Sequence, residues 1–365
     1  MGIRILTIVG ARPQFIKAVV VSRELRKDHT EILVHTGQHY DYDMSEIFFK
    51  ELEIPDPDYN LGISGGTHGE MTGKMLIEIE AVLLKEKPDM VLVYGDTNST
   101  MAGALSAVKL HVPVCHVEAG GRLGTINNPE EVNRIVTDHV SSLKLCCTES
   151  ALKFLQKEGI AKDSYLIGDP MYDAFKYYSE KIGEFAPEQL IGLDGKEKKL
   201  PKSFYYMTCH REENAGNDEV LNEILSAMES LDEVCIYPVH PRNRDRVSRL
   251  IEEKKYRNII ACKPVGYMMS IYLVNHSKKI VTDSGGLQRE AFFAEKQCVT
   301  VFDYVVWPET MIDNRNQLAK PCKKDILSKL SEKQIVKESN AFGDGKAAIK
   351  IIKYINEYIN GGVKE

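Results

Sequence analysis

The sequence predicts an α/β fold in which helices cover parallel sheets, organised as about two domains. Short β-branched runs at 3–9, 90–94 and 280–283 are each followed by a longer segment of helical pattern. Strands that alternate with helices are typical of parallel sheets. A chain of 365 residues is too long for one ordinary hydrophobic core, so two domains are expected.

The first part of the chain predicts a regular series of strands and helices. Strands are expected at 3–9, 31–37, 90–94, 112–117, 143–147 and 164–170. Helices are expected from about Pro13 and at 41–53, 70–86, 98–110, 127–139 and 150–158. Residues 54–73 predict a long polar connection rich in glycine, and loops of that length tend to be functional or mobile.

The second part repeats the α/β pattern. Residues 176–202, rich in lysine, glutamate and glycine, predict an irregular crossing between the domains. Strands are expected at 204–208, 235–239, 258–262, 280–283 and 298–302, the last of these being the final strand. An amphipathic helix is expected at 344–360. We place the first domain at 1–172 and the second at 173–343.

The chain is organised around the turn Ser284-Gly285-Gly286, which joins a buried strand to a helix. Two glycines let the backbone approach a ligand closely, and the following helix offers unpaired N–H groups and a partial positive charge. This arrangement predicts a seat for an anion such as a diphosphate. Glu290, about one turn into the helix, could hold a ribose diol. The alternative is that Ser284 is an ordinary N-cap and Glu290 an ordinary helix residue.

Polar residues follow the predicted strands of the first domain. Arg12, His39, Asp96 and Glu118 each come after a strand, and Lys17 follows one turn beyond Arg12. Ligands of open α/β sheets bind outside the carboxyl ends of the strands, so these side chains are expected to converge.

Glu130 opens the next predicted helix and would add a third acid to Asp96 and Glu118. Neighbouring carboxylates differ in pKa, which lets one act as a base while another carries a proton. This is the composition needed to remove a proton on one face of a carbon and deliver it on the other.

Composition excludes several classes of function. The net charge of −6 argues against a nucleic-acid partner. No run approaches the length of a transmembrane helix, and no signal peptide is expected. The eight cysteines form no CxxC pair, which predicts reduced thiols in a cytoplasmic protein and no metal site. No GxGxxG fingerprint is present, so no dinucleotide cofactor is expected.

Nine short motifs together resemble the non-hydrolysing UDP-N-acetylglucosamine 2-epimerase family, in the family's order and spacing from about residue 3 to 318. They are Gly10-Ala11-Arg12-Pro13, Gly37-Gln38-His39, Gly95-Asp96-Thr97-Asn98, His116-Val117-Glu118-Ala119-Gly120, Pro129-Glu130-Glu131, His210-Arg211 with Glu213-Asn214, Pro238-Val239-His240-Pro241, Thr282-Asp283-Ser284-Gly285-Gly286 and Trp307-Pro308-Glu309-Thr310.

The resemblance implies a GT-B fold, with two Rossmann-like domains facing across a cleft and a terminal helix, about 344–365, packed back on the first domain. It also implies inversion at the sugar C2 without a cofactor, by elimination of UDP to a 2-acetamidoglucal and re-addition. It assigns catalysis to Asp96, Glu118, Glu130 and His210. UDP and substrate binding falls to Arg12, Lys17, Arg134, His240, Tyr267, Ser284, Gly285, Gly286 and Glu290, and a possible allosteric loop to Gln38 and His39.

The substrate stays open at this point. Gly121-Arg122-Leu123-Gly124 stands where the family usually has Leu-Arg-Ser, and Phe302-Asp303-Tyr304-Val305-Val306 stands where it usually has Arg-Asp-x-Thr-Glu. The first expectation is interconversion of UDP-GlcNAc and UDP-ManNAc for surface polysaccharide, by a homodimer. The alternative is the 2-epimerase of UDP-2,3-diacetamido-2,3-dideoxyglucuronic acid, whose carboxylate would need an added cation from Arg122, Arg134, Arg242 or Arg315. A hydrolysing epimerase, a GT-B glycosyltransferase and a nucleotide-sugar-binding protein without turnover are further alternatives.

Overall fold

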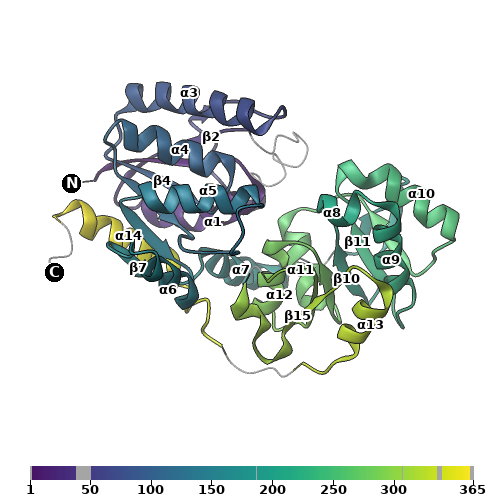
Figure 1. Ribbon diagram of the computed structural model, residues 1–365. Coiled ribbons are helices and arrows are strands. Elements are labelled where there is room, and N and C mark those ends of the chain that lie inside the picture. The colour runs from purple at the N-terminus through teal and green to yellow at the C-terminus, as the bar shows by residue number, and fades with distance from the viewer. Residues whose placement is uncertain (1, 38–50, 186, 306, 335–338, 362–365) are drawn as a thin grey trace. The chain divides into compact units, whose positions relative to one another are not determined.

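The computed structural model describes residues 2–37, 51–185, 187–305, 307–334 and 339–361 (Figure 1). The chain forms two compact units. Unit 1 comprises Met1–Lys176 and Ser339–Glu365, and unit 2 comprises Tyr177–Glu338. Within the described residues, no helix is both long and apolar enough to cross a membrane.

Unit 1 is built on a parallel sheet with the strand order β3-β2-β1-β4-β5-β6-β7. Its strands are β1 (Arg4–Val9), β2 (Thr30–His35), β3 (Tyr59–Asn60), β4 (Met90–Tyr94), β5 (Val114–Val117), β6 (Leu143–Cys146) and β7 (Ser164–Leu166). The central strands are mostly apolar and buried, as expected for a sheet covered on both faces. All five residues of β4 are buried.

The helices of unit 1 are α1 (Arg12–Leu25), α3 (His68–Glu86), α4 (Asn98–Lys109), α5 (Pro129–Val140), α6 (Glu149–Lys157), α7 (Pro170–Lys181) and α14 (Ala347–Ile359). Helices α3, α4 and α5 lie side by side, and α1 packs against α14 (Figure 1). Helix α7 begins in unit 1, and its last turn belongs to unit 2.

The terminal helix α14 returns to unit 1. Its buried stripe includes Ile351 and Ile355, both fully buried. The ring of Tyr354 stacks on that of Tyr165 with 4.1 Å between centroids. At the start of the helix, the N–H of Ala348 donates to a carboxylate oxygen of Asp173 at 2.8 Å.

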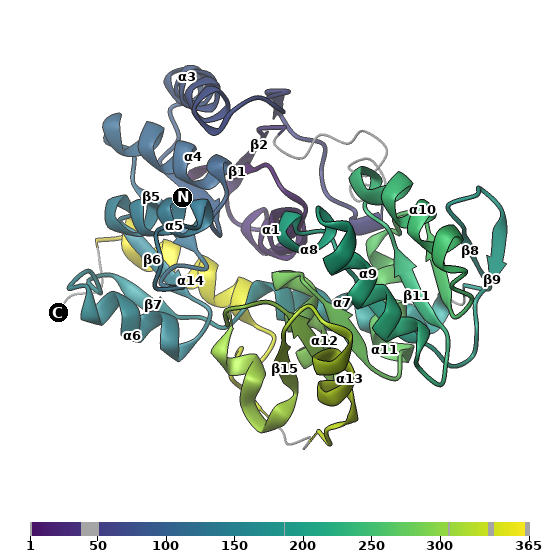
Figure 2. The same cartoon turned by 45° about the vertical axis from the view of Figure 1, so that its right-hand side comes forward.

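Unit 2 has a second parallel sheet, with the order β12-β11-β10-β13-β14-β15. Its strands are β10 (Tyr205–Thr208), β11 (Cys235–Pro238), β12 (Ile259–Cys262), β13 (Ile280–Thr282), β14 (Cys298–Val301) and β15 (Asn316–Ala319). Its helices are α8 (Glu212–Ala215), α9 (Asp218–Glu229), α10 (Arg244–Lys254), α11 (Tyr267–His276), α12 (Gly285–Phe293) and α13 (Lys323–Ser331), with short 3₁₀ turns η1 (Ile182–Glu184), η2 (Pro241–Asn243) and η3 (Pro308–Asn314). An antiparallel hairpin, β8 (Gln189–Ile191) and β9 (Glu197–Lys199), lies beside α10 (Figure 2).

The predicted α/β class with parallel sheets is confirmed, and three local predictions are wrong. The strand 298–302 is not the last, because β15 follows it; β15 carries Asn316 and Gln317, whose polarity hides a buried strand from a hydrophobicity pattern. The crossing at 176–202 is not irregular but contains the end of α7 and the β8–β9 hairpin. The connection at 54–73 contains β3, and α3 already begins at His68, behind a capping box formed by Thr67 and Glu70.

Candidate functional site

The strand orders mark one candidate ligand-binding position in each unit. The order reverses between β1 and β4 in unit 1, and between β10 and β13 in unit 2. Ligands of open α/β sheets bind at the carboxyl ends of the strands beside such a switch point. The loops that start at Gly10 and Gly95 flank the first position, and the loops that start at Cys209 and Asp283 flank the second.

A buried glutamine joins the two switch-point loops of unit 1. The side-chain oxygen of Gln14 accepts the N–H of Gly10 at 2.8 Å, and its amide nitrogen donates to the carbonyl of Tyr94 at 2.7 Å. Arg12 opens helix α1 in the first of these loops and is half-buried. These bonds therefore fix the backbone that presents Arg12 and, in the second loop, Asp96.

Lys17, in α1, and Glu118, directly after β5, form a buried ion pair. The side chains are 3% and 11% exposed, and the ammonium of Lys17 donates to a carboxylate oxygen of Glu118. Glu118 has a φ of 71°, a left-handed backbone that is uncommon for a side chain other than glycine. Such strain is frequent where a side chain must be aimed at a functional site.

Arg134 on α5 holds two carboxylates at once, those of Asp96 and Glu131. Burial lowers the pKa of Arg134, but the two carboxylates outweigh this effect and leave its pKa above the usual value. The guanidinium is therefore a permanent cation between the loop after β4 and the first turn of α5. It also interacts electrostatically with Glu118.

The adjacent residues Glu130 and Glu131 face different surroundings. Glu131 is 1% exposed, and its second oxygen accepts the N–H of Leu123 at 2.8 Å. Glu130 is exposed in the first turn of α5, where its N–H donates to the N-cap side chain of Asn128 at 2.8 Å. In this unit Asp96 and Glu118 thus lie beside Arg134 and Lys17 respectively, with Glu131 as a further buried acid.

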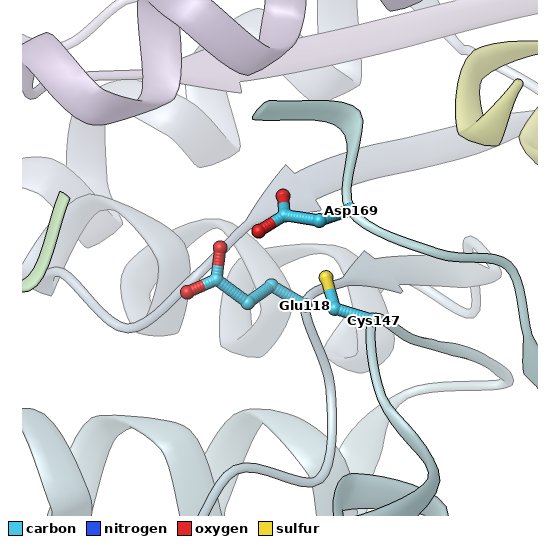
Figure 3. A group of neighbouring side chains, drawn as sticks. All are labelled: Glu118, Cys147 and Asp169. Atoms are coloured by element: carbon cyan, nitrogen blue, oxygen red, sulfur yellow. The ribbon is translucent and has the colours of Figure 1, made fainter. Parts of the chain in front are cut away.

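Two further groups gather at Glu118. Its carboxylate, the Cys147 sulfur and the Asp169 carboxylate lie within 4.8 Å of one another (Figure 3). Carboxylates and a thiol are residue types that can hold a metal ion, but here the ammonium of Lys17 already supplies a cation to Glu118. We therefore interpret the group as a charge cluster and assign no metal or cofactor to it.

A histidine and an aspartate fix the two strand-end loops that carry the acids. The imidazole of His116 lies 2.7 Å from a carboxylate oxygen of Asp138 and 2.7 Å from the carbonyl of Gly95. Asp138 also accepts the N–H of Gly120 at 3.0 Å and a guanidinium N–H of Arg122 at 2.6 Å. Burial raises the pKa of Asp138, but His116 and Arg122 together lower it by more, so the net pKa is below its usual value.

In unit 2, Asp283 organises the loop that carries His210. The buried carboxylate of Asp283 accepts the N–H of His210 at 2.9 Å and the N–H of Arg211 at 2.9 Å. A second contact joins its other oxygen to Nδ1 of His210 at 3.2 Å. The ring of His210 remains 39% exposed. Asp283 thus sets the position of His210 from the residue directly before the Ser-Gly-Gly turn.

Ser284 is the N-cap of α12, and its hydroxyl accepts the N–H of Leu287 at 3.3 Å. This agrees with the ordinary N-cap interpretation, but it leaves the other N–H groups of the first turn without partners inside the helix. A Cβ added at Gly285 would meet nothing closer than the Gln288 side chain at 4.0 Å among the described residues. A side chain at Gly285 would therefore have room, while Glu290 is 4% exposed within α12.

The structure also shows the surroundings of two other residues predicted in unit 2, His240 and Tyr267. His240 caps η2, and its ring lies 6.4 Å from that of His210. Tyr267 begins α11, is 1% exposed and packs edge-on against the ring of Tyr178. Gln38 and His39, the predicted allosteric loop, fall outside the described residues.

The four arginines considered for a substrate carboxylate differ in availability. Arg122 pairs with Asp138 and Glu158, and Arg134 is held between its own two acids. Arg315 is buried at the start of β15, over the ring of Phe292. Arg242 is exposed and donates to the carbonyl of His210 at 2.9 Å. Arg242 therefore contacts the His210 loop within unit 2 and keeps exposed side-chain surface.

Sequence reasoning missed several residues that shape these positions: Gln14, Glu131, Asp138, Cys147, Asp169 and Asp283. A signal existed for Asp169 and Asp283, because each follows a strand as Asp96 does. Nothing local separated Glu131 from Glu130, or marked Gln14 as more than a helix residue.

The chain is similar to known proteins over nearly its whole length. It matches the UDP-N-acetylglucosamine 2-epimerase family over residues 23–356. It is 46% identical over 361 residues to a UDP-N-acetylglucosamine 2-epimerase homolog of Methanococcus maripaludis, covering 96% of this chain and 99% of the relative. It is 44% identical over 363 residues to the UDP-2,3-diacetamido-2,3-dideoxy-D-glucuronate 2-epimerase of Pseudomonas aeruginosa, with the same coverage.

Among solved structures, the fold is similar to that of Methanocaldococcus jannaschii UDP-GlcNAc 2-epimerase in complex with UDP-GlcNAc and UDP. The TM-score is 0.86 at 38% identity, covering 97% of this chain and 99% of that one. The predicted GT-B class with two Rossmann-like units is confirmed. A match to the family over most of the chain, together with relatives above 40% identity over nearly the full length, supports one conclusion. The chain is an epimerase and belongs to the UDP-N-acetylglucosamine 2-epimerase family.

Proposed function

We propose that this protein is a non-hydrolysing UDP-sugar 2-epimerase that interconverts UDP-GlcNAc and UDP-ManNAc, to supply precursors of surface polysaccharide. The observation that carries the proposal is the set of acid–cation pairs at the strand ends of unit 1, Lys17 with Glu118 and Arg134 with Asp96. Acids held in place by neighbouring basic side chains are positioned to exchange a proton with a weakly acidic carbon.

The reaction has two steps. A carboxylate removes the C2 proton while the C1–O bond breaks and UDP leaves, which forms a 2-acetamidoglucal. UDP then adds back to C1 as a second acid delivers a proton to the other face of C2. Asp96, Glu118 and Glu130 are the proposed acid and base groups, and His210 stabilises the leaving diphosphate.

UDP binding is proposed for unit 2. The first-turn N–H groups at Ser284, Gly285 and Gly286 would hold the diphosphate at the positive end of α12. Glu290 would accept the ribose hydroxyls, and His240 and Tyr267 would line the nucleotide. Arg12 and Lys17 are the proposed cations of unit 1 toward the substrate.

The second candidate substrate is UDP-2,3-diacetamido-2,3-dideoxyglucuronic acid. The 44% identity to the Pseudomonas aeruginosa enzyme favours it, as does an exposed Arg242 beside His210, where a C6 carboxylate could be paired. Replacement of Arg242 by glutamine should raise KM for the uronate substrate about tenfold or more, and should leave KM for UDP-GlcNAc nearly unchanged.

We also propose a homodimer. The side chains of Ile77 and Leu84 are 69% and 57% exposed and lie two turns apart on one face of α3. Light scattering of the purified protein and of an Ile77→Lys variant tests this assignment. A cytoplasmic location is proposed because seven of the eight cysteines are buried and are not joined in disulfides.

The decisive test is NMR of products formed in heavy water from UDP-GlcNAc and from the diacetamido uronate. We expect the epimer with deuterium at C2 and intact UDP-sugar. Stoichiometric free sugar and UDP would instead identify a hydrolysing enzyme, and turnover that requires an acceptor a glycosyltransferase. Binding of UDP without turnover or deuterium exchange would identify a binding protein and refute the proposal.

A further inference from the structure

Three neighbouring strands of unit 1 deliver one group each to the same point. Glu118 follows β5, Cys147 follows β6 and Asp169 lies three residues after β7, and these strands are adjacent in the sheet. Figure 3 shows the two carboxylates and the thiol turned toward one another. One carboxylate oxygen of each acid and the sulfur of Cys147 lie within 4.8 Å of one another. The convergence is therefore a product of sheet order and not of local sequence.

Asp169 is a buried acid with a rigid backbone. Its side chain is 0% exposed, its N–H donates to the carbonyl of Phe342 at 2.9 Å, and one carboxylate oxygen accepts the N–H of Met171 at 2.9 Å. The last bond makes Asp169 a cap for α7. Capping needs only an acceptor oxygen, which serine, threonine or asparagine could supply as well. The cap therefore does not explain why an acid is buried beside Glu118.

Several acids compete for the cations at Glu118. Lys17 pairs with Glu118 directly, and Arg134 acts on it electrostatically while it is also shared by Asp96 and Glu131. Asp169 adds another carboxylate at close range. A negative charge at such a distance in a buried place makes ionisation of the Glu118 carboxyl less favourable. A proton on Glu118 would relieve the repulsion.

We propose that Asp169 is a positioning residue for the 2-epimerase reaction, which keeps a proton available on Glu118 for delivery to C2 of the sugar. Lys17 orients the carboxylate of Glu118 from one side. On the other side, the buried charge of Asp169 makes Glu118 bind its proton more tightly. Delivery of this proton to C2 of the sugar rests on the proposed function. The electrostatic coupling between the two carboxylates does not depend on it.

The test replaces Asp169 by asparagine. The D169N variant keeps the acceptor oxygen for the α7 cap and removes the charge. The carboxyl ¹³C signal of Glu118, assigned by its loss in E118Q, is followed against pH in both proteins without substrate. We expect its midpoint to fall by about one to two pH units in D169N. The acid limb of the kcat/KM profile should move by the same amount and in the same direction.

The matched control is Asp173→Asn, which removes an acid one turn further along α7, outside the group at Glu118. It should leave the Glu118 midpoint within about 0.3 pH units. An unchanged Glu118 midpoint in D169N would overturn the inference and leave Asp169 as a helix cap. If D169N does not fold, the wild type decides: coupled acids give a two-step Glu118 curve, and a single-step curve overturns the inference. Absence of C2 deuterium in the wild type would refute the proposed function and not this coupling.

Discussion

Replacement of Asp173 by asparagine should change how the stability of unit 1 depends on pH. Asp173 accepts the N–H of Ala348 and so holds the start of α14, while its other carboxylate oxygen is buried with no hydrogen-bond partner among the described residues. Burial raises the pKa of Asp173 from 3.8 to about 6, although the N–H groups of Ala348 and Ala347 oppose the shift. The terminal helix is thus held by an acid that is costly to ionise.

The direction of the effect follows from proton linkage. Because the folded-state pKa is the higher one, the folded protein binds this proton more tightly than the unfolded chain does. The stabilisation is complete below about pH 4 and is lost as the pH rises through about 6. A difference of about 2 pKa units corresponds to about 3 kcal/mol. The side chain introduced in D173N is neutral at every pH and keeps an oxygen for Ala348, so the variant should lack this contribution to the pH dependence.

The measurement compares hydrogen exchange and urea unfolding of the two proteins between about pH 4.5 and 8. Exchange of α14 reports on unit 1, whereas fluorescence of the single tryptophan, Trp307, reports on unit 2. We expect the variant to gain stability relative to the wild type by about 2–3 kcal/mol across this range. Asp344→Asn, whose exposed carboxylate pairs with Lys350 at 3.0 Å, is the control. Parallel curves for wild type and D173N would refute the reasoning.

Three other predictions concern the site. Glu131→Gln should lower the unfolding free energy by about 3 kcal/mol, because it leaves the buried guanidinium of Arg134 with one charged partner fewer. Glu130→Gln should lower it by less than about 0.5 kcal/mol in urea unfolding and should lower kcat. The reverse order of the two stabilities would contradict the assignment. Asp283→Asn should lower kcat about tenfold or more with little change in KM and shift the ¹⁵N signals of His210, and unchanged signals would show that the contact is incidental. Gly285→Ala should fold normally but weaken UDP binding about tenfold in calorimetry, since the methyl group occupies the approach to the helix N-terminus; unaltered affinity would remove the diphosphate from this position.

Much of the fold could be predicted from local pattern. Runs such as β1 and β4 are largely apolar because both faces of a parallel sheet are covered, so they stand out in the sequence. β15 could not be found in this way, because Asn316 and Gln317 are buried through hydrogen bonds to distant segments. The β8–β9 hairpin was missed for a similar reason: its outward residues are charged, and its backbone partners lie in β12.

The sequence by itself determined the sheet-forming runs, the Ser-Gly-Gly turn and the acids placed after strands, because propensity and periodicity act over a few residues. Only the tertiary structure decided that Glu131 and not Glu130 meets Arg134, that Asp283 holds the His210 loop, and that Asp169 lies against Glu118. These pairings join residues far apart in the chain or select one of two neighbours by helix rotation. Strand order and burial set them, and neither is encoded in the spacing of the residues along the chain.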